Sequence, residues 1–244
     1  MDCAIVDMVI VKYIKLRGLG KRQRIPNLRR TKMEENKIYN KDCLEFMKTL
    51  SDNHFDLIIT DPPYGIGVAK KGNVGGDNLG KAKDYGECKW DSEIPSEEIF
   101  KEMFRVSKNQ IIFGGNYFVE YLKNSPCWIV WDKDNTGNFA DCELVWTSFN
   151  TAVRKFKWRW NGMLQEKMNW KEKRFHPTQK PVPLMRWIIE NYSAKEDKIF
   201  DPFAGSGSTL VACKQEGRNF VGCEINKEYC DIINKRLSQE TLFD

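Results

Sequence analysis

The chain has 244 residues, of which 41% are hydrophobic and 12% aromatic, and its formal net charge is +5. This length suits one sizeable α/β domain, and the apolar content excludes a chain that is disordered throughout. No apolar run reaches the roughly 20 residues that a membrane-spanning helix needs, so we expect a soluble, cytoplasmic protein without a signal peptide.

Cysteine and histidine usage argues against a metal centre. The eight cysteines form no Cys-x-x-Cys pair, and only His54 and His176 are present. A zinc site would lack its usual ligands, so we expect no bound metal. Reduced thiols in the cytosol are the simpler interpretation of the cysteines.

The positive charge is concentrated at the N-terminus. Residues 1–32 hold nine Lys or Arg against two Asp, a net charge of +7. We expect this basic arm to be disordered because its apolar residues follow no regular period, although contact with phosphates is an alternative. Residues 33–244 are expected to form a single domain.

Strands and helices alternate along that domain. The first half predicts a strand over 37–40, a helix over 43–50, a buried strand over 55–60, a long mobile loop over 65–92 and a helix over 96–106. The second half predicts strands over 111–114, 128–131 and 143–149, a helix over 182–192, and a final strand, helix, strand, helix series. Such alternation predicts a mainly parallel sheet with helices on both faces.

A turn suited to a nucleoside ligand follows the strand over 198–200. Gly205 and Gly207 let the backbone of segment 201–209 turn tightly and approach a ligand. Glu224 ends the next strand, where a carboxylate can accept hydrogen bonds from two ribose hydroxyls. A dinucleotide-binding oxidoreductase fits less well, because its third glycine is replaced by Leu210.

The segment Asp61-Pro62-Pro63-Tyr64 ends the strand over 55–60. Its plain structural interpretation is a proline turn. Its residue types also suit the activation of an aromatic amine: the Asp61 carboxylate and the Pro62 carbonyl can hold the two amine hydrogens, and Tyr64 offers a face for stacking. The nitrogen lone pair is then directed at an electrophilic methyl group.

In these motifs and their order, the sequence resembles the permuted (β) class of DNA amino-methyltransferases. The similar segments are 40–43, 56–64, 176–181 (His-Pro-Thr-Gln-Lys-Pro), 201–209 and 222–224. The resemblance implies a Rossmann-like class I methyltransferase fold with a mostly parallel, seven-stranded sheet. It also implies S-adenosylmethionine as cofactor and site-specific methylation of adenine N6 in double-stranded DNA, as in restriction-modification systems.

The resemblance assigns roles to individual residues. It makes Asp61, Pro62, Pro63 and Tyr64 catalytic, and it places Asp42 and Cys43 near the cofactor adenine and Glu224 on the ribose. The methionine half would lie against Asp201, Phe203, Ala204, Gly205, Ser206 and Gly207, with Thr178 and Lys180 near its carboxylate. Asp42 is alternatively a helix cap, and His176 is expected to order its turn without acting as a base.

The target base must leave the duplex to reach such a site, so duplex-binding residues are expected as well. In segment 154–160, basic residues alternate with aromatic ones. We expect Arg154, Lys155, Lys157 and Arg159 to contact DNA within a recognition insert over 150–175. The structural alternative is an edge strand with its aromatic face in the core, and both interpretations can be true at once. The short insert suits a short target, or a homodimer in place of a monomer.

Other functions stay open. Cytosine N4 methylation uses the same amine chemistry, although permuted members acting there more often have Ser in place of Asp61. RNA methylation and a non-catalytic DNA-binding module are further alternatives.

Overall fold

The computed structural model describes residues 33–67, 73–74, 83–84, 93–135, 140–161 and 164–239. The basic arm and most of the predicted loop over 65–92 lie outside this part. Within that loop, β3 (Asn73–Val74) pairs antiparallel with β4 (Lys83–Asp84). No helix among the described residues is long and apolar enough to span a membrane.

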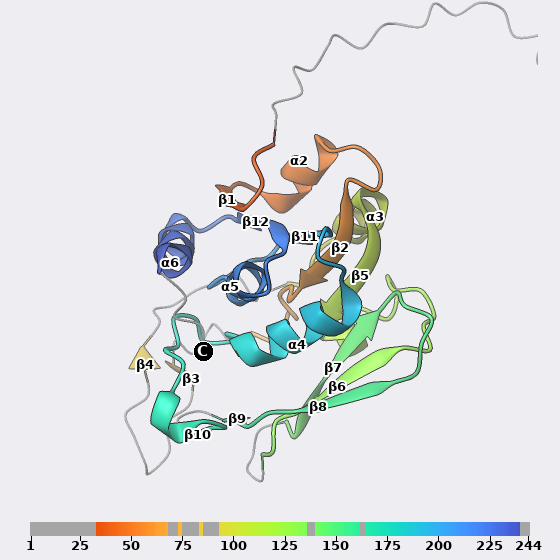
Figure 1. The fold of residues 1–244 in the computed structure, drawn as a ribbon. Helices are drawn as coiled ribbons and strands as arrows, with labels where there is room; N and C mark the ends of the chain where they lie inside the picture. Colours follow the sequence, from red (N-terminus) through yellow and green to blue (C-terminus); the bar gives the residue numbers. More distant parts are fainter. Residues whose placement is uncertain are drawn as a thin grey trace, which may run out of the picture. The chain divides into compact units, whose positions relative to one another are not determined.

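One sheet of eight strands forms the centre of the fold (Figure 1), in the order β1-β12-β11-β2-β5-β7-β6-β8. The strands are β1 (Lys37–Asn40), β2 (Phe55–Thr60), β5 (Ser107–Phe113), β6 (Trp128–Asp132), β7 (Cys142–Thr147), β8 (Arg154–Lys157), β11 (Lys198–Asp201) and β12 (Asn219–Glu224). The first five strands in this order, β1, β12, β11, β2 and β5, are parallel, and β7 is antiparallel to both of its neighbours.

The predicted mostly parallel fold is confirmed, but the predicted number of seven strands is one too few. The additional strand is β8, which pairs parallel with β6 and places Lys155 opposite Val130. This is the segment in which basic and aromatic residues alternate. Its period of two is a strand period, so the backbone can extend the sheet while its two faces meet different surroundings.

Two groups of helices cover the sheet (Figure 1). Helices α2 (Cys43–Lys48) and α3 (Glu97–Val106) pack together, and α4 (Val182–Tyr192) packs on α5 (Ser208–Gln215), which contacts α6 (Lys227–Ser238). The crossovers through α2 and α3 run from β1 towards β5, whereas the crossover through α5 runs from β11 back to β12. Because such crossovers are right-handed, α5 lies on the face opposite α2 and α3.

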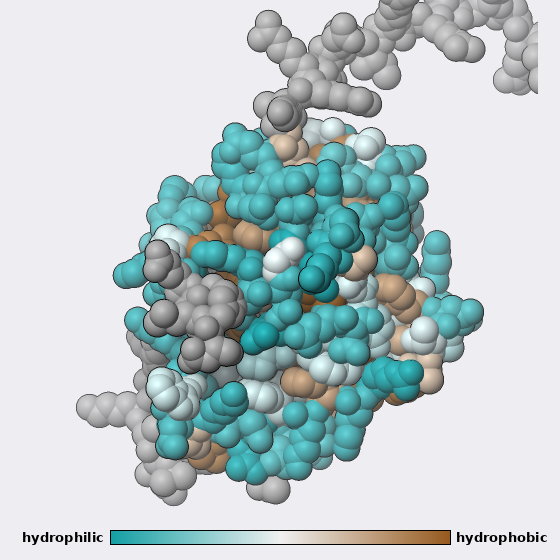
Figure 2. All heavy atoms as spheres, in the orientation of Figure 1, coloured by the Kyte–Doolittle hydropathy of each residue, from teal (hydrophilic) through white to brown (hydrophobic). Residues whose placement is uncertain are grey.

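Apolar strand residues supply the core between these layers. In β2, Phe55, Leu57, Ile58 and Ile59 are buried, and the Phe55 ring stacks on Phe200 of β11 with centroids 4.6 Å apart. Figure 2 shows hydrophilic residues over most of the visible face. Because both faces of these central strands are buried, their sequences are nearly continuous apolar runs without alternation.

The direction in which consecutive strands are added to the sheet changes between β11 and β2. From β2 the chain proceeds to β5 on one side, and from β11 it proceeds to β12 on the other, although β2 and β11 are direct neighbours. The loops that leave their carboxyl ends therefore diverge. In open α/β sheets a crevice for ligands forms at such a point.

Replacing Phe200 should weaken the core measurably. Phe200→Ala removes a fully buried ring that packs on Phe55 and Phe46, so we expect a loss of about 3–5 kcal/mol in unfolding free energy, measured by urea denaturation. Val153→Ala, at an exposed position, should change stability by less than about 0.5 kcal/mol. Equal effects of the two variants would contradict the described core.

Candidate active site

A buried hydrogen bond joins the two loops at the centre of the sheet. Thr60, the last residue of β2, donates from Oγ1 to Oδ1 of Asp201 at 2.9 Å, and the Phe203 amide donates to the same oxygen at 3.1 Å. Burial raises the pKa of the Asp201 carboxyl to about 7, although hydrogen bonds from Thr209 and Thr60 oppose the shift. Asp201 therefore fixes the start of residues 201–209, here called the glycine-rich loop, against the segment that carries Asp61.

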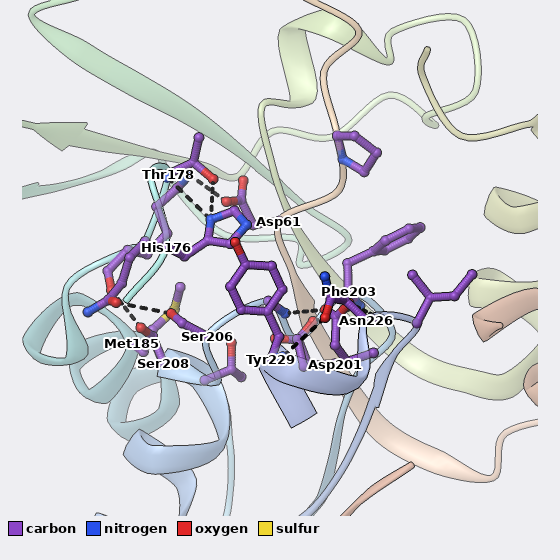
Figure 3. A pocket seen from close by; sticks show the side chains of 18 residues that line it. Asp61, His176, Thr178, Met185, Asp201, Phe203, Ser206, Ser208, Asn226 and Tyr229 are labelled. Atoms are coloured by element: carbon purple, nitrogen blue, oxygen red, sulfur yellow. Dashed lines mark hydrogen bonds and ion pairs between the residues drawn. The ribbon is translucent and has the colours of Figure 1, made fainter. Parts of the chain in front are cut away.

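A cavity of about 490 Å³ opens between these loops (Figure 3). Its wall comes from five segments: the residues after β2, the His176 turn, α4, the glycine-rich loop with the start of α5, and the connection from β12 into α6. The lining residues are Asp61, Pro63, His176, Thr178, Gln179, Lys180, Met185, Asp201, Phe203, Ala204, Gly205, Ser206, Ser208, Thr209, Glu224, Ile225, Asn226 and Tyr229. Its volume is within the range of small-molecule sites, roughly 300–1,000 Å³.

Glu224 is held at the cavity by backbone amides. Its Oε2 accepts from the Gly205 amide at 2.9 Å and its Oε1 from the Asn226 amide at 2.8 Å. Burial raises the pKa of Glu224 above its ordinary value. Gly205 and Gly207 adopt positive φ values of 53° and 81°, which explains the need for glycine in this turn.

Asp61 belongs to a row of alternating charges. Its Oδ2 lies 2.6 Å from the Lys180 ammonium, which also lies 3.2 Å from Oε2 of Glu143, and Oε1 of Glu143 lies 2.5 Å from Lys133. The Lys180 side chain is only 6% exposed. Burial alone would lower the pKa of Lys180, but the two carboxylates raise it above its ordinary value, so this lysine remains charged. The row pairs two cations with two anions and is internally neutral.

The Tyr64 ring is packed among aromatic rings at the carboxyl end of β5. It stacks on Tyr117 with centroids 4.8 Å apart, and its hydroxyl donates to Oδ1 of Asp61 at 2.5 Å. Gly114 lies under this ring with φ of 66°, and a Cβ there would come within 2.3 Å of Tyr64 Cε1. Only glycine therefore allows Tyr64 to occupy this position.

His176 orders the turn that precedes α4, as the sequence predicts. Its Nδ1 lies 3.3 Å from the Thr178 amide and 3.1 Å from the Thr178 hydroxyl (Figure 3). Burial lowers the pKa of His176 to about 4, with a further contribution from Lys180. The ring is therefore neutral at physiological pH and accepts the amide proton.

Most of the predicted site residues line one cavity. Ten do so: Asp61, Pro63, Thr178, Lys180, Asp201, Phe203, Ala204, Gly205, Ser206 and Glu224. Pro62, Tyr64, Gly207, Asp42 and Cys43 are not among the lining residues. Oδ1 of Asp42 accepts from the Glu45 amide at 3.0 Å and caps α2, next to buried Cys43. Both still follow β1, in which Asn40 pairs with Glu224.

Several residues in and around the site were not predicted from the sequence. Glu143 and Lys133 come from β7 and the turn after β6, and only the tertiary fold brings them to Lys180. Asn226 and Tyr229 reach the cavity because Glu224 is followed at once by α6, a connection that the predicted strand and helix already implied. Within the described residues, no group of three His, Cys, Asp or Glu is placed to hold a metal ion.

Three of the four predicted DNA-contacting residues form ion pairs within the protein. Lys155 lies 3.4 Å from Asp132, Lys157 lies 2.8 Å from Asp134, and Arg159 also pairs with Asp134. On the other face of the segment, Phe156 packs on Trp187 of α4 with centroids 5.2 Å apart. The structural alternative, an edge strand with its aromatic face inwards, is therefore observed. DNA contact by the basic side chains stays a prediction.

Comparison with known proteins gives one consistent family. A family model described as DNA methylase matches residues 130–235. The chain is 30% identical to the Type II methyltransferase M.HpaI of Haemophilus parainfluenzae, over 82% of this chain and 73% of that protein. It is 27% identical to the Type II methyltransferase M2.DpnII of Streptococcus pneumoniae, over 83% of this chain and 90% of that protein.

A solved structure agrees with these relatives. The complex of M1.HpyAVI with SAM is 26% identical and superimposes with a TM-score of 0.52, covering 83% of this chain and 99% of that one.

The neutral state of His176 predicts a specific acid sensitivity. Because the folded-state pKa of about 4 lies below the unfolded value near 6.5, protonation favours unfolding. Stability should thus be full above about pH 6.5 and fall, by on the order of 3 kcal/mol, as the pH drops to about 4. His176→Asn keeps an acceptor for the Thr178 amide but does not titrate.

Urea denaturation of both proteins between pH 7 and pH 4 tests this. The difference in stability between wild type and His176→Asn should shift in favour of the variant as the pH falls. A difference that is independent of pH would contradict the assigned state of His176.

Proposed function

The chain belongs to the DNA methylase family and is an S-adenosylmethionine-dependent DNA methyltransferase, and we propose that it methylates N6 of an adenine flipped out of double-stranded DNA. The family follows from the relative that is 30% identical over most of both chains. The observation that carries the proposed chemistry is the Asp61 carboxylate, which lines the same cavity as the glycine-rich loop and Glu224.

The cavity has the groups that this cofactor requires. Glu224 presents an oriented carboxylate for two ribose hydroxyls, and the backbone turn at Gly205 leaves space for close approach. Phe203, Met185 and Ile225 supply apolar lining, and Lys180 supplies a cation. S-adenosylmethionine, when bound, supplies a methyl group on a positively charged sulfur. We propose that the cofactor-binding set is the ten lining residues named above other than Asp61 and Pro63, together with Gly207, Asp42 and Cys43.

Asp61, Pro62, Pro63 and Tyr64 would activate the target amine. A carboxylate has about four lone-pair positions, and Tyr64 and Lys180 take one on each oxygen of Asp61. The carboxylate thus keeps acceptor capacity for one N6 hydrogen, and the Pro62 carbonyl is suited to accept the other. Holding both hydrogens favours a pyramidal nitrogen with its lone pair directed at the electrophile.

Lys180 and Glu143 adjust the charge at Asp61. As the amine attacks, positive charge develops on N6, and a nearby carboxylate stabilises it in a site of low polarity. Lys180 alone would cancel that effect. Glu143 shares the Lys180 ammonium and so leaves Asp61 with part of its negative charge. The surplus proton leaves N6 after transfer, and no covalent intermediate with the protein is needed.

Adenine is favoured over cytosine by the residue at position 61. The same amine geometry serves cytosine N4, the second candidate target, but permuted enzymes acting on cytosine more often have Ser where this chain has Asp61. We propose that Arg154, Lys155, Lys157 and Arg159, in an insert over 150–175, contribute to duplex binding, and that the enzyme works as a monomer or homodimer. We also propose that residues 33–244 form one methyltransferase domain.

Replacing the Asp61 carboxylate should remove catalysis without removing cofactor binding. Asp61→Asn keeps the shape of the side chain but not its charge, so we expect single-turnover methyl transfer to fall at least about 100-fold. Transfer of tritiated methyl groups to duplex DNA measures the rate, and calorimetry measures cofactor affinity. Glu196→Gln, at an exposed turn, is the matched control. Full activity of Asp61→Ala would refute the mechanism.

The methylated product identifies the target. Duplex DNA, single-stranded DNA and RNA are treated with the protein, digested to nucleosides and separated by chromatography with mass detection. We expect N6-methyladenosine in its deoxy form from duplex DNA. Deoxy N4-methylcytidine would establish the second candidate, and product from RNA alone would exclude DNA as substrate.

Gly114 offers an independent test of the Tyr64 position. Gly114→Ala places a methyl group against the Tyr64 ring and strains a backbone with φ of 66°. We expect kcat to fall by more than tenfold, while cofactor affinity stays within about twofold because the glycine-rich loop is untouched. Thermal melting checks that the variant folds. Unchanged kcat in a folded variant would show that the Tyr64 position is not needed.

A further inference from the structure

Residues 166–171 form a closed loop beside the cavity. The side-chain amide of Gln165 pairs with the backbone of Glu172 in both directions, with Nε2 donating to the Glu172 carbonyl at 2.9 Å and Oε1 accepting from the Glu172 amide at 2.7 Å. The loop contains the 3-10 turn η4 (Met168–Trp170) and follows β9 (Trp160–Asn161) and β10 (Leu164–Gln165), which lie below α4 in Figure 1. Its two ends are thus fixed to each other.

The same loop is anchored to the cavity wall through Glu172. The Glu172 carboxylate accepts from Gln179 Nε2 at 2.8 Å, from the Val182 amide at 3.0 Å and from Arg236 at 3.2 Å. Arg236 also donates to the carbonyl of Ser206 at 2.6 Å. Gln179 and Ser206 both line the cavity. The loop therefore has a rigid base, and the negative charge of Glu172 is paired with Arg236 inside the protein.

The outer side of the loop is apolar and basic. Trp170 is 84% exposed and Met168 is 48% exposed. Lys167, Lys171 and Lys173 are exposed as well, whereas Glu166 accepts a hydrogen bond from the Arg159 amide. We call residues 167–171 the Trp170 tip. An indole held in water on a rigid, positively charged support is unusual for a surface that binds nothing.

We propose that the Trp170 tip inserts into double-stranded DNA at the flipped base. This inference rests on the proposed function, because a flipped base leaves a gap in the stack that a planar side chain can fill. Every base has a π face, so indole stacking tolerates any sequence, and Lys167 and Lys171 would meet the flanking phosphates. The anchor through Glu172 holds the tip at a fixed place relative to the cavity that receives the base.

Charge favours DNA over a second copy of the chain as the occupant. A symmetric contact through the tip would bring Lys167 and Lys171 of one copy near the same residues of the other. Such like charges repel each other, whereas the phosphate backbone neutralises them. A second copy is therefore kept as an outcome of the test.

The experiment compares Trp170→Ala, Trp170→Phe and Lys171→Ala in the full chain. Fluorescence anisotropy measures binding to a fully paired DNA duplex and to the same duplex with one central unpaired adenine, each over a range of salt concentrations. Lys195→Ala removes an exposed charge from the turn before β11, at the amino end of that strand, whereas the cavity lies at its carboxyl end; this variant serves as the matched control. Sedimentation velocity records the oligomeric state of each variant.

We expect Trp170→Ala to weaken binding of the paired duplex by about ten- to a hundredfold with an unchanged salt slope, and Trp170→Phe to retain most of the affinity. The loss should be smaller with the unpaired adenine, since less energy is needed to open that site. Lys171→Ala should lower the salt slope by about one. Lys195→Ala should bind as wild type does.

The opposite results would overturn the inference. Equal binding of both duplexes by Trp170→Ala and wild type excludes insertion, and a change of oligomeric state without a change in DNA affinity assigns the tip to a protein interface. Failure of the proposed function is distinguishable, because it is judged by methylated product and not by binding. If the wild type binds DNA through Trp170 but transfers no methyl group, the proposed insertion of Trp170 stands and the proposed function fails.

Discussion

The hydrogen bond from Thr60 to Asp201 is the constraint on which the active site depends. Thr60 ends β2 and Asp201 ends β11, and these strands are neighbours whose chains then continue in opposite directions across the sheet. A cavity arises there because nothing in the sheet fills the space between two diverging loops. Fixing the ends of both strands to one buried carboxylate brings the amine-binding segment and the cofactor segment into one site.

The charged side chains around Asp61 alternate in sign. Lys180 lies between Asp61 and Glu143, and Lys133 completes the row, so each ion has an opposite neighbour. An isolated buried carboxylate would become protonated and lose its ability to accept an amine hydrogen. Burial raises the pKa of Asp61 and the shared lysine opposes that rise, while the second carboxylate limits how strongly the lysine neutralises Asp61.

The sequence predicted the local structure well because its patterns are local. The helix Val182–Tyr192 and the strand Phe55–Thr60 have the predicted bounds, and the family resemblance located both loops. Glu143 was missed because its position in a strand says nothing about which distant lysine it meets. For β8, the alternation predicted a strand, but the ion pairs of Lys157 and Arg159 with Asp134 depend on a turn brought there by tertiary packing.

The strand order also has a consequence for synthesis on the ribosome. β1 and β2 are consecutive in the chain, yet β12 and β11 lie between them in the sheet. Because β1 pairs only with β12, it cannot take its final place until nearly the entire polypeptide has emerged, and Arg236 of α6 donates to the Ser206 carbonyl only then. Contacts between such distant segments form slowly, and strand edges stay exposed until they form. Nascent chains of this protein are therefore expected to depend on chaperones more than their modest size suggests.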